Sequence, residues 1–238
     1  MPSAFFLAQT AAEFQQVLPP VAQKAWMACH FSPYGTGLSN LPSQLPAGSM
    51  LIVNDRTPVA GHDPQKIVWQ LEQLAEEHAL SRILLDFQRS GEARTEAIAK
   101  AIVQALPCPV GVSSHYAAGL DCPVFLPPLP LHMPPAAYFA PWSNRRIWLE
   151  IAPLCAVYTV TESGCAQAVC EESGHFPHFD EQAICRYRIE LQSDAACFTL
   201  CRGLEELAML RQNGAVDCFV GLYQDFAQPD AQETAFDQ

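Results

Sequence analysis

The stretch SRILLDFQRSG, residues 81–91, is apolar enough to form a buried strand, yet it carries polar side chains near its end. The apolar residues at alternate positions are Ile83, Leu85 and Phe87. Between them lie Leu84, Asp86 and Gln88. Because successive side chains of a strand point to opposite faces, the pattern predicts a strand with one face packed against helices. The other face becomes polar at its carboxyl end, where Asp86 and Gln88 line a site.

Helix signals stand on both sides of this stretch. Residues 62–80 carry Asp63 as an N-cap and Pro64 at the first helical position, followed by apolar residues at helical spacing. Residues 91–107 repeat apolar side chains on one face and end at Pro107. A third helix is expected at 203–214. Strand, helix and strand at these lengths predict parallel strands joined by crossover helices.

Eight apolar runs have the length of strands. They are residues 25–32, 49–56, 82–89, 108–116, 123–131, 145–152, 196–202 and 216–225. Eight strands in about 200 residues predict an α/β fold, an irregular (β/α)8 TIM-like barrel. Its outer helices should be reduced, because too few residues separate the first two runs for a crossover helix. The alternative is an open doubly wound sheet, but no glycine-rich phosphate turn follows the first run.

The chain is expected to form one barrel domain over residues 1–226, with an insertion at about 152–192. Within the insertion, CAVYTVT and AICRYRIEL alternate in the manner of β-strands and predict a late antiparallel addition to the barrel. Residues 227–238 are polar and acidic and predict a loose tail.

Charge and composition exclude several kinds of partner. The 238 residues carry a net charge of -12, and an acidic surface repels nucleic acid and anionic membranes, so neither is expected as a partner. No apolar run approaches the roughly 20 residues of a membrane span. The start of the sequence lacks the basic region of a secretory signal, so a cytoplasmic protein is expected.

The ten cysteines form no C-x-x-C pair. In a cytoplasmic protein they are expected to be reduced and mostly buried. The alternative is a metal site at Cys165 and Cys170, or at Cys197 and Cys201. Neither a P-loop nor a G-x-G-x-x-G motif is present, so no cofactor is expected.

The alternation that orients residues 82–88 also orients the other strands. With the apolar set of each strand placed outward, the set facing the barrel interior and its mouth is His30, Asn54, Arg56, Asp86, Gln88, His115, Trp148, Glu150 and Tyr223. Barrel enzymes keep their sites at the carboxyl ends of the strands, so this set predicts a functional cleft. A structural alternative is that Arg56 neutralises Asp86 or Glu150 in the interior. Asp55 and Arg89 are expected near the surface, where they make loop contacts only.

The two carboxylates Asp86 and Glu150 indicate the chemistry of this cleft. Glycosidic cleavage uses two carboxyl groups, and Trp148 and Tyr223 offer aromatic faces to a sugar. No serine lies in a G-x-S-x-G elbow. Two alternatives stay open. The two histidines of the set could bind a metal with the carboxylates for hydrolysis, or the barrel could bind a glycan or act as a scaffold without catalysis.

The run LLDFQ, together with a late antiparallel insertion, resembles the chitinase-type glycoside hydrolases. Their signature strand, the fourth of the barrel, ends in D-x-x-D-x-D-x-E. Asp86 matches the final aspartate, and Gln88 stands at the glutamic acid. Ser81 and Leu84 stand at the earlier aspartates, and the run is the third of the eight. The resemblance implies a glycan ligand at the mouth. The stretches NDRTPVAGHD and LLDFQR also resemble a group of bacterial proteins.

Gln88 departs from the family pattern at its most important position. In the family this glutamic acid protonates the leaving oxygen, whereas the amide of glutamine has no acidic proton to give. Either Glu150 supplies the acid from another strand, or the barrel binds a glycan without cutting it.

Overall fold

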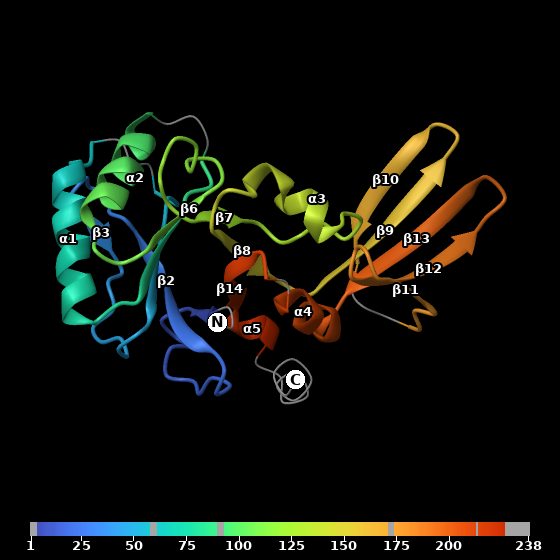
Figure 1. Ribbon diagram of the computed structural model, residues 1–238, viewed down its shortest axis with the longest axis horizontal. Helices are drawn as coiled ribbons and strands as arrows, with labels where there is room; N and C mark the ends of the chain where they lie inside the picture. Colours follow the sequence, from blue (N-terminus) through green and yellow to red (C-terminus); the bar gives the residue numbers. More distant parts are fainter. Residues whose placement is uncertain (1–3, 58–60, 90–92, 171–173, 213, 227–238) are drawn as a thin grey trace.

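A closed barrel of eight parallel strands forms the centre of the computed structural model, which describes residues 4–57, 61–89, 93–170, 174–212 and 214–226 (Figure 1). In order around the barrel the strands are β1 (Ala4–Gln9), β2 (Gln23–Phe31), β4 (Met50–Asn54), β5 (Arg82–Asp86), β6 (Val110–Ser113), β7 (Val124–Leu126), β8 (Ile147–Ile151) and β14 (Val216–Leu222). The barrel closes because β1 pairs with both β14 and β2. The expected TIM-like barrel is therefore confirmed. The expected tail at 227–238 lies outside the described residues.

Two strand assignments from the sequence were wrong. The run AFFLAQ at residues 4–9 forms the first barrel strand, although it has the appearance of a short apolar patch near the start of the sequence. Residues 196–202 belong to β13 (Ala195–Arg202) of a separate antiparallel sheet, because their backbone pairs with neighbouring hairpins and not with the barrel. With β1 counted, β5 is the fourth strand of the barrel and not the third.

Helices cover the barrel on one part of its circumference only. Helix α1 (Pro64–Glu77) connects β4 to β5, and α2 (Ala93–Ala105) connects β5 to β6. Asp63 caps α1 as expected, since its side chain accepts a hydrogen bond from the backbone N–H of Gln65 at 3.0 Å. The other helices are short: α3 (Pro135–Phe139), the 3-10 turn Ala140–Trp142, α4 (Leu204–Arg211) and α5 (Tyr223–Phe226). No helix in the described ranges is long and apolar enough to cross a membrane.

Two apolar layers hold the barrel together, one on each face of its wall. The outer layer joins the helices to strand residues such as Ile83, Leu85 and Phe87, all of which are fully buried. The inner layer fills the barrel with residues such as Leu84 and Trp148. Trp148 needs a glycine on the neighbouring wall, because a Cβ atom on Gly111 would lie 2.2 Å from its ring.

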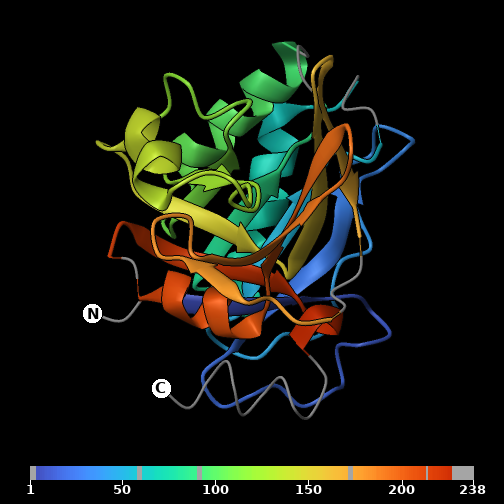
Figure 2. The ribbon, with the colours of Figure 1, turned by 90° about the vertical axis from the view of Figure 1, so that its right-hand side faces the viewer.

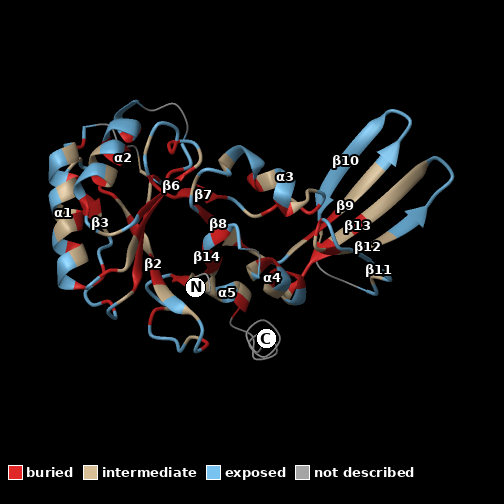
Figure 3. Cartoon of the chain, in the orientation of Figure 1, coloured by how far each residue is buried: buried red, intermediate tan, exposed pale blue. Residues whose placement is uncertain are grey.

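The antiparallel sheet is inserted between the last two barrel strands and projects to one side of the barrel (Figures 1 and 2). Its strand order is β10 (Gly164–Val169), β9 (Leu154–Thr161), β13, β12 (Cys185–Leu191) and β11 (His178–Asp180). The base of the sheet is buried and its tips are exposed (Figure 3). At the base the buried guanidinium of Arg202 donates hydrogen bonds to the carbonyl oxygens of Leu129, Ala183 and Ile184 at 2.5, 2.7 and 3.0 Å.

Candidate functional site

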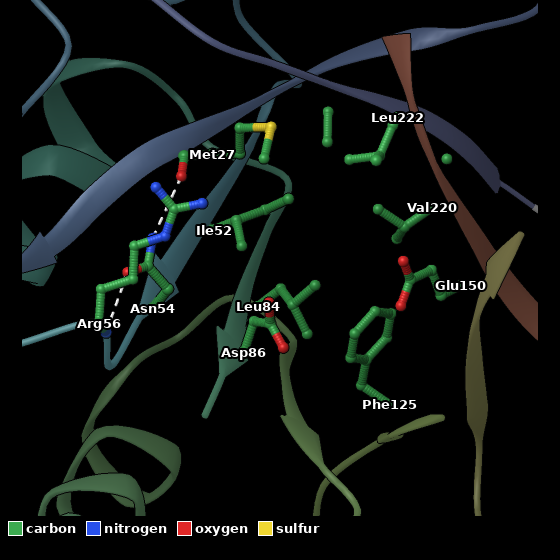
Figure 4. A pocket seen from close by; sticks show the side chains of 12 residues that line it. Met27, Ile52, Asn54, Arg56, Leu84, Asp86, Phe125, Glu150, Val220 and Leu222 are labelled. Carbon is green, nitrogen blue, oxygen red and sulfur yellow. Dashed lines mark hydrogen bonds between the residues drawn. The ribbon is translucent and has the colours of Figure 1, made fainter. Parts of the chain in front are cut away.

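A pocket opens where the barrel strands end, with a cavity volume of about 90 Å³ (Figure 4). Its apolar side chains include Ile52, Leu84, Phe125 and Val220. Its polar side chains are Asn54, Arg56, Asp86 and Glu150. Asn54 and Asp86 are the last residues of β4 and β5, so the pocket lies at the carboxyl ends of the strands. This is the mouth that the sequence predicts, and four of the nine expected site residues meet there.

Asp86 enters the pocket from the end of the fourth barrel strand. Its Oδ1 accepts a hydrogen bond of 2.5 Å from the side-chain amide of Gln88. The pKa of the Asp86 carboxyl is raised, mainly by burial and to a smaller extent by the charge of Asp55. The Gln88 hydrogen bond and the charge of Arg56 lower it and offset part of this shift. Gln88 itself is exposed and acts on the pocket through this hydrogen bond.

Asp55 fixes the turn that follows β5. Its carboxylate is 3% exposed and accepts the backbone N–H groups of Gln88 and Arg89, each at 2.9 Å. A charged acceptor that joins two backbone donors holds this turn in place beside Asp86. Asp55 was expected near the surface. This was wrong, because the side chain turns inward to satisfy the two donors, although the loop contacts themselves are present.

Glu150 enters the pocket from β8, on the other side from Asp86. Figure 4 shows the two carboxyl groups on either side of the Phe125 ring in that view. Burial first, and then the negative charges of Asp86 and Asp225, raise the pKa of Glu150 to about 7. Glu150 in turn contributes to the raised pKa of Tyr138, whose main cause is burial. A carboxyl group in this state carries a proton in a large fraction of molecules at neutral pH.

Asn54 and Arg56 form the side of the pocket next to β2. The amide of Asn54 donates to the carbonyl oxygens of Cys29 and Met27 at 3.0 and 3.3 Å, and its Oδ1 accepts the backbone N–H of Arg56 at 3.2 Å (Figure 4). The Arg56 guanidinium forms no ion pair with either pocket carboxylate, since the ion pairs among the described residues all lie in β12 and α4. The structural alternative for Arg56 is therefore not supported.

His30 lies in a second space beside the pocket. This space has a volume of about 240 Å³ and shares Met27 and Arg56 with the first. The Nδ1 atom of His30 is 2.8 Å from the carbonyl oxygen of Phe31 and 3.2 Å from the hydroxyl of Thr57. Its Nε2 is 3.1 Å from the side-chain amide of Asn40. Neither Thr57 nor Asn40 could be predicted from strand alternation, because both lie in loops.

Three expected site residues lie elsewhere. His115 is exposed in the turn after β6, which ends at Ser113. Trp148 points inward as expected but is fully buried, so no face of its ring is open to a sugar. Tyr223 begins α5 and packs on the outer apolar layer. Alternation along a strand indicates which side a residue faces, but not how deep in the barrel it lies.

The error at Tyr223 has a structural cause. An inward Tyr223 requires Cys218 and Val220 to face outward by alternation, but these two residues fill the barrel and Phe219 joins the outer layer. The pairing of β14 with β8 has a register irregularity at the start of β14. The pairing of β2 with β4 has another, and there Met27 turns inward. A shift of one residue exchanges the two faces of a strand, and β14 is apolar on both faces.

Phe125, Tyr138 and Asp225 were not expected at the site. Phe125 lies in the pocket at the centre of the short strand β7, and alternation through Val124 and Leu126 would have placed it inward. Tyr138 lies in the proline-rich segment before β8, where the sequence has no repeating apolar pattern from which the direction of its side chain could be predicted. Asp225 follows β14 and acts on Glu150 through its charge.

The donor set does not favour the metal alternative. In the described parts of the chain, no three His, Cys, Asp or Glu side chains come together as a group that could hold a metal ion. The two histidines on which that alternative depends are separated, one in the second space and one in an exposed turn. At the cysteine sites Cys170 lies beside Cys155, with 3.2 Å between the sulfur atoms, and not beside Cys165.

Comparison with known proteins gives matches in structure only. No protein-family model and no curated protein matches the sequence. A GH18 chitinase from Cycas revoluta in complex with (GlcNAc)3 is similar with a TM-score of 0.58 and 9% identity, over 99% of both chains. A class V chitinase from Nicotiana tobaccum in complex with NAG4 matches with a TM-score of 0.57 and 8% identity, over 98% of this chain and 97% of the other.

A bacterial enzyme shares the same architecture. The spore cortex-lytic enzyme SleL from Bacillus cereus matches with a TM-score of 0.55 and 9% identity, over 93% of this chain and 71% of that one. These structures carry the barrel over nearly the whole of the present chain. The chain thus has the barrel fold of the GH18 chitinases and of SleL.

Proposed function

We propose that the barrel binds a carbohydrate at the carboxyl ends of its strands and acts on it as a glycoside-hydrolase-like enzyme, with Asp86 and Glu150 as the catalytic pair. The observation that carries this proposal is the state of Glu150. Its carboxyl group lies in the pocket with Asp86, and its pKa is raised to about 7. Glycosidic cleavage requires a carboxylic acid that keeps its proton at neutral pH, beside a second carboxyl group.

The environments of the two carboxyl groups favour different roles for them. Glu150 is the weaker acid and donates its proton to the glycosidic oxygen as the bond breaks. Burial raises the pKa of Asp86, but the hydrogen bond from Gln88 and the positive charge of Arg56 act in the opposite direction and favour its ionised form. In its ionised form Asp86 supplies the negative charge opposite the sugar. In this proposal Glu150 replaces the glutamic acid that the family carries at the position of Gln88.

The shape of the site is compatible with a sugar. The Phe125 ring and Met27 offer apolar surface beside the carboxyl groups. The first pocket alone is small, but the two adjoining spaces of about 90 and 240 Å³ together reach the lower end of the range for small-molecule sites, roughly 300 Å³. A sugar substituent would enter the barrel while the rest of the ligand lies toward Arg56.

A second candidate is a lectin-like barrel that binds a glycan without cutting it. The observation that favours it is Gln88, an amide in the place of the family's acid. The two candidates share the ligand and differ only in whether Glu150 transfers a proton.

A paired assay of turnover and binding tests both. Release of nitrophenol from a panel of aryl glycosides measures cleavage, and calorimetry with N-acetylglucosamine oligomers measures binding. The oligomers are chosen because chitinases of this fold were solved with them. Cleavage that disappears in Glu150→Gln supports the enzyme, whereas saturable binding without cleavage supports the lectin. The matched control is Glu77→Gln, on the exposed side of α1. If the wild-type protein neither binds nor cleaves, the carbohydrate proposal is wrong.

A further inference from the structure

The charges at the mouth of the barrel are separated into two sides. Asp86 and Glu150 lie in the first pocket, and Asp225 lies close enough to raise the pKa of Glu150. Arg56 stands at the boundary between the two spaces, and His30 lies in the second. Among the described residues, none of those lining the second space is a carboxylate. A ligand that spans both spaces therefore meets negative charge at one end and a cation at the other.

The guanidinium of Arg56 has its donors available. Arg56 is exposed, and only its backbone is used in hydrogen bonds with described residues: its N–H donates to the side chain of Asn54, and its carbonyl oxygen accepts from the guanidinium of Arg89. No described residue pairs with its side chain. In a chain with 13 basic and 25 acidic residues, Arg56 lowers the pKa of Asp86 through its charge but forms no ion pair with a described carboxylate, so its guanidinium can bind an anionic ligand.

Neighbouring groups make the second space suited to an oxyanion. The guanidinium of Arg89 donates to the carbonyl oxygen of Arg56 at 2.6 Å, so a second positive charge lies next to the backbone of Arg56. The side-chain amide of Asn40 lies beside His30, whereas the hydroxyl of Thr57 donates its hydrogen to the carbonyl oxygen of Phe31 at 2.6 Å. Thr10 lines this space, and its backbone N–H and hydroxyl donate to the carboxylate of Glu13 at 2.9 and 2.8 Å.

We infer that the ligand is an acidic saccharide, whose carboxylate, sulfate or phosphate group binds to Arg56 in the second space. This inference rests on the proposed function and specifies the class of its ligand. Guanidinium binds such groups through two parallel hydrogen bonds, which a neutral hydroxyl does not allow. The acidic group faces away from Asp86 and Glu150, since like charges in one pocket repel. The charge separation therefore also sets the direction of the ligand across the mouth.

Matched oligosaccharides test the inference. Calorimetry compares a neutral N-acetylglucosamine tetramer with a hyaluronan tetrasaccharide, in which every second sugar carries a carboxylate, and with a sulfated N-acetylglucosamine tetramer. The wild-type protein should bind at least one acidic probe about 10-fold more tightly than the neutral one. Sodium chloride should weaken the acidic complex and leave the neutral one little changed.

Variants locate the effect. In Arg56→Gln the ratio of acidic to neutral affinity should fall by about 10-fold, and Arg56→Lys should recover only part of it, because a point charge cannot form the paired contact. Arg146→Gln, which removes a charge from an exposed residue before β8 at the opposite end of the barrel, should leave the ratio unchanged. A thermal melt confirms that each variant is folded.

The outcomes separate this inference from the proposed function. Equal wild-type affinity for the neutral and both acidic probes, or a ratio that Arg56→Gln does not change, overturns the acidic ligand and leaves the carbohydrate proposal standing. Absence of saturable binding to any probe overturns both.

Discussion

Replacement of Glu150 by glutamine should stabilise the protein at high pH and leave its stability unchanged at low pH. Glutamine keeps the shape of the side chain but has no charge to bury. The folded state raises the pKa of Glu150 to about 7 from an ordinary value of 4.5, mainly through burial and then through Asp86 and Asp225. The native state therefore holds this proton more tightly than the unfolded chain does.

The sign and size of the effect follow from linkage. Below pH 4.5 the carboxyl group is protonated in both states, and its contribution to stability is at its maximum. As pH rises through 4.5 to about 7, the unfolded state ionises first and the free energy of unfolding falls. Each pH unit between the two pKa values corresponds to about 1.4 kcal/mol, so the total is on the order of 3 kcal/mol above pH 7. For a domain of this size that corresponds to roughly 6–12 °C in Tm.

The assay is a series of thermal or urea melts between pH 4 and pH 8. Glu150→Gln should melt about 6–12 °C above wild type at pH 8 and within a degree or two of it at pH 4. Glu77→Gln, on the exposed side of α1, serves as the control and should follow wild type throughout. If Glu150→Gln gains nothing at pH 8, the carboxyl group is not held in a desolvated pocket near Asp86, and its role as a proton donor would lose its physical basis.

Four further outcomes follow from the structure. Asp86→Asn should abolish ligand binding or turnover with a Tm at or above wild type, since Asp86 has no ion-pair partner; a loss of roughly 3 to 5 kcal/mol in a melt would instead indicate a structural salt bridge. Asp55→Ala should cost about 2 to 4 kcal/mol in urea unfolding, because two backbone N–H groups lose their acceptor; a neutral result would contradict its role in the turn after β5. Gly111→Ala should cost about 3 kcal/mol or more in the same assay, since the new methyl group meets the Trp148 ring. Gly48→Ala is the comparison: no atom lies within 4 Å of its new methyl group, so its loss of stability measures only the strain of an alanine at a positive φ. All ten cysteines should be alkylated in freshly purified protein that is denatured without a reductant, and unlabelled pairs would contradict this. A disulfide oxidant should first join Cys155 to Cys170, whose sulfur atoms are 3.2 Å apart; peptide mapping that finds Cys29 or Cys218 paired first would refute this order.

The sequence predicted the site where one face of a strand was clearly more apolar than the other. In β5 the outward residues Ile83, Leu85 and Phe87 leave no choice of phase, and Asp86 lies in the pocket as expected. The same holds for β8, where Ile147 and Leu149 fix the direction of Glu150.

Prediction failed where the deciding interaction was long-range. Both faces of β14 are apolar, so its phase depends on pairing with β1 and β8, and Tyr223 was assigned to the wrong side. Trp148 was assigned to the correct side, but its depth depends on how the strands are staggered around the barrel. Asp55 is buried only because the turn after β5, more than 30 residues later, presents two donors to it.

Closure of the barrel links the two ends of the described chain. Residues Ala4–Ala8 of β1 pair with Cys218–Leu222 of β14, so the final seam joins segments more than 200 residues apart. Until β14 is synthesised, β1 and β8 are open sheet edges, and the inner apolar layer lacks one of its walls. Contacts between residues so far apart in the sequence make folding slow, because the chain loses the entropy of a long loop before the contact stabilises it. During synthesis the nascent barrel is therefore an incomplete sheet that is vulnerable to strand addition by other chains until its last strand arrives.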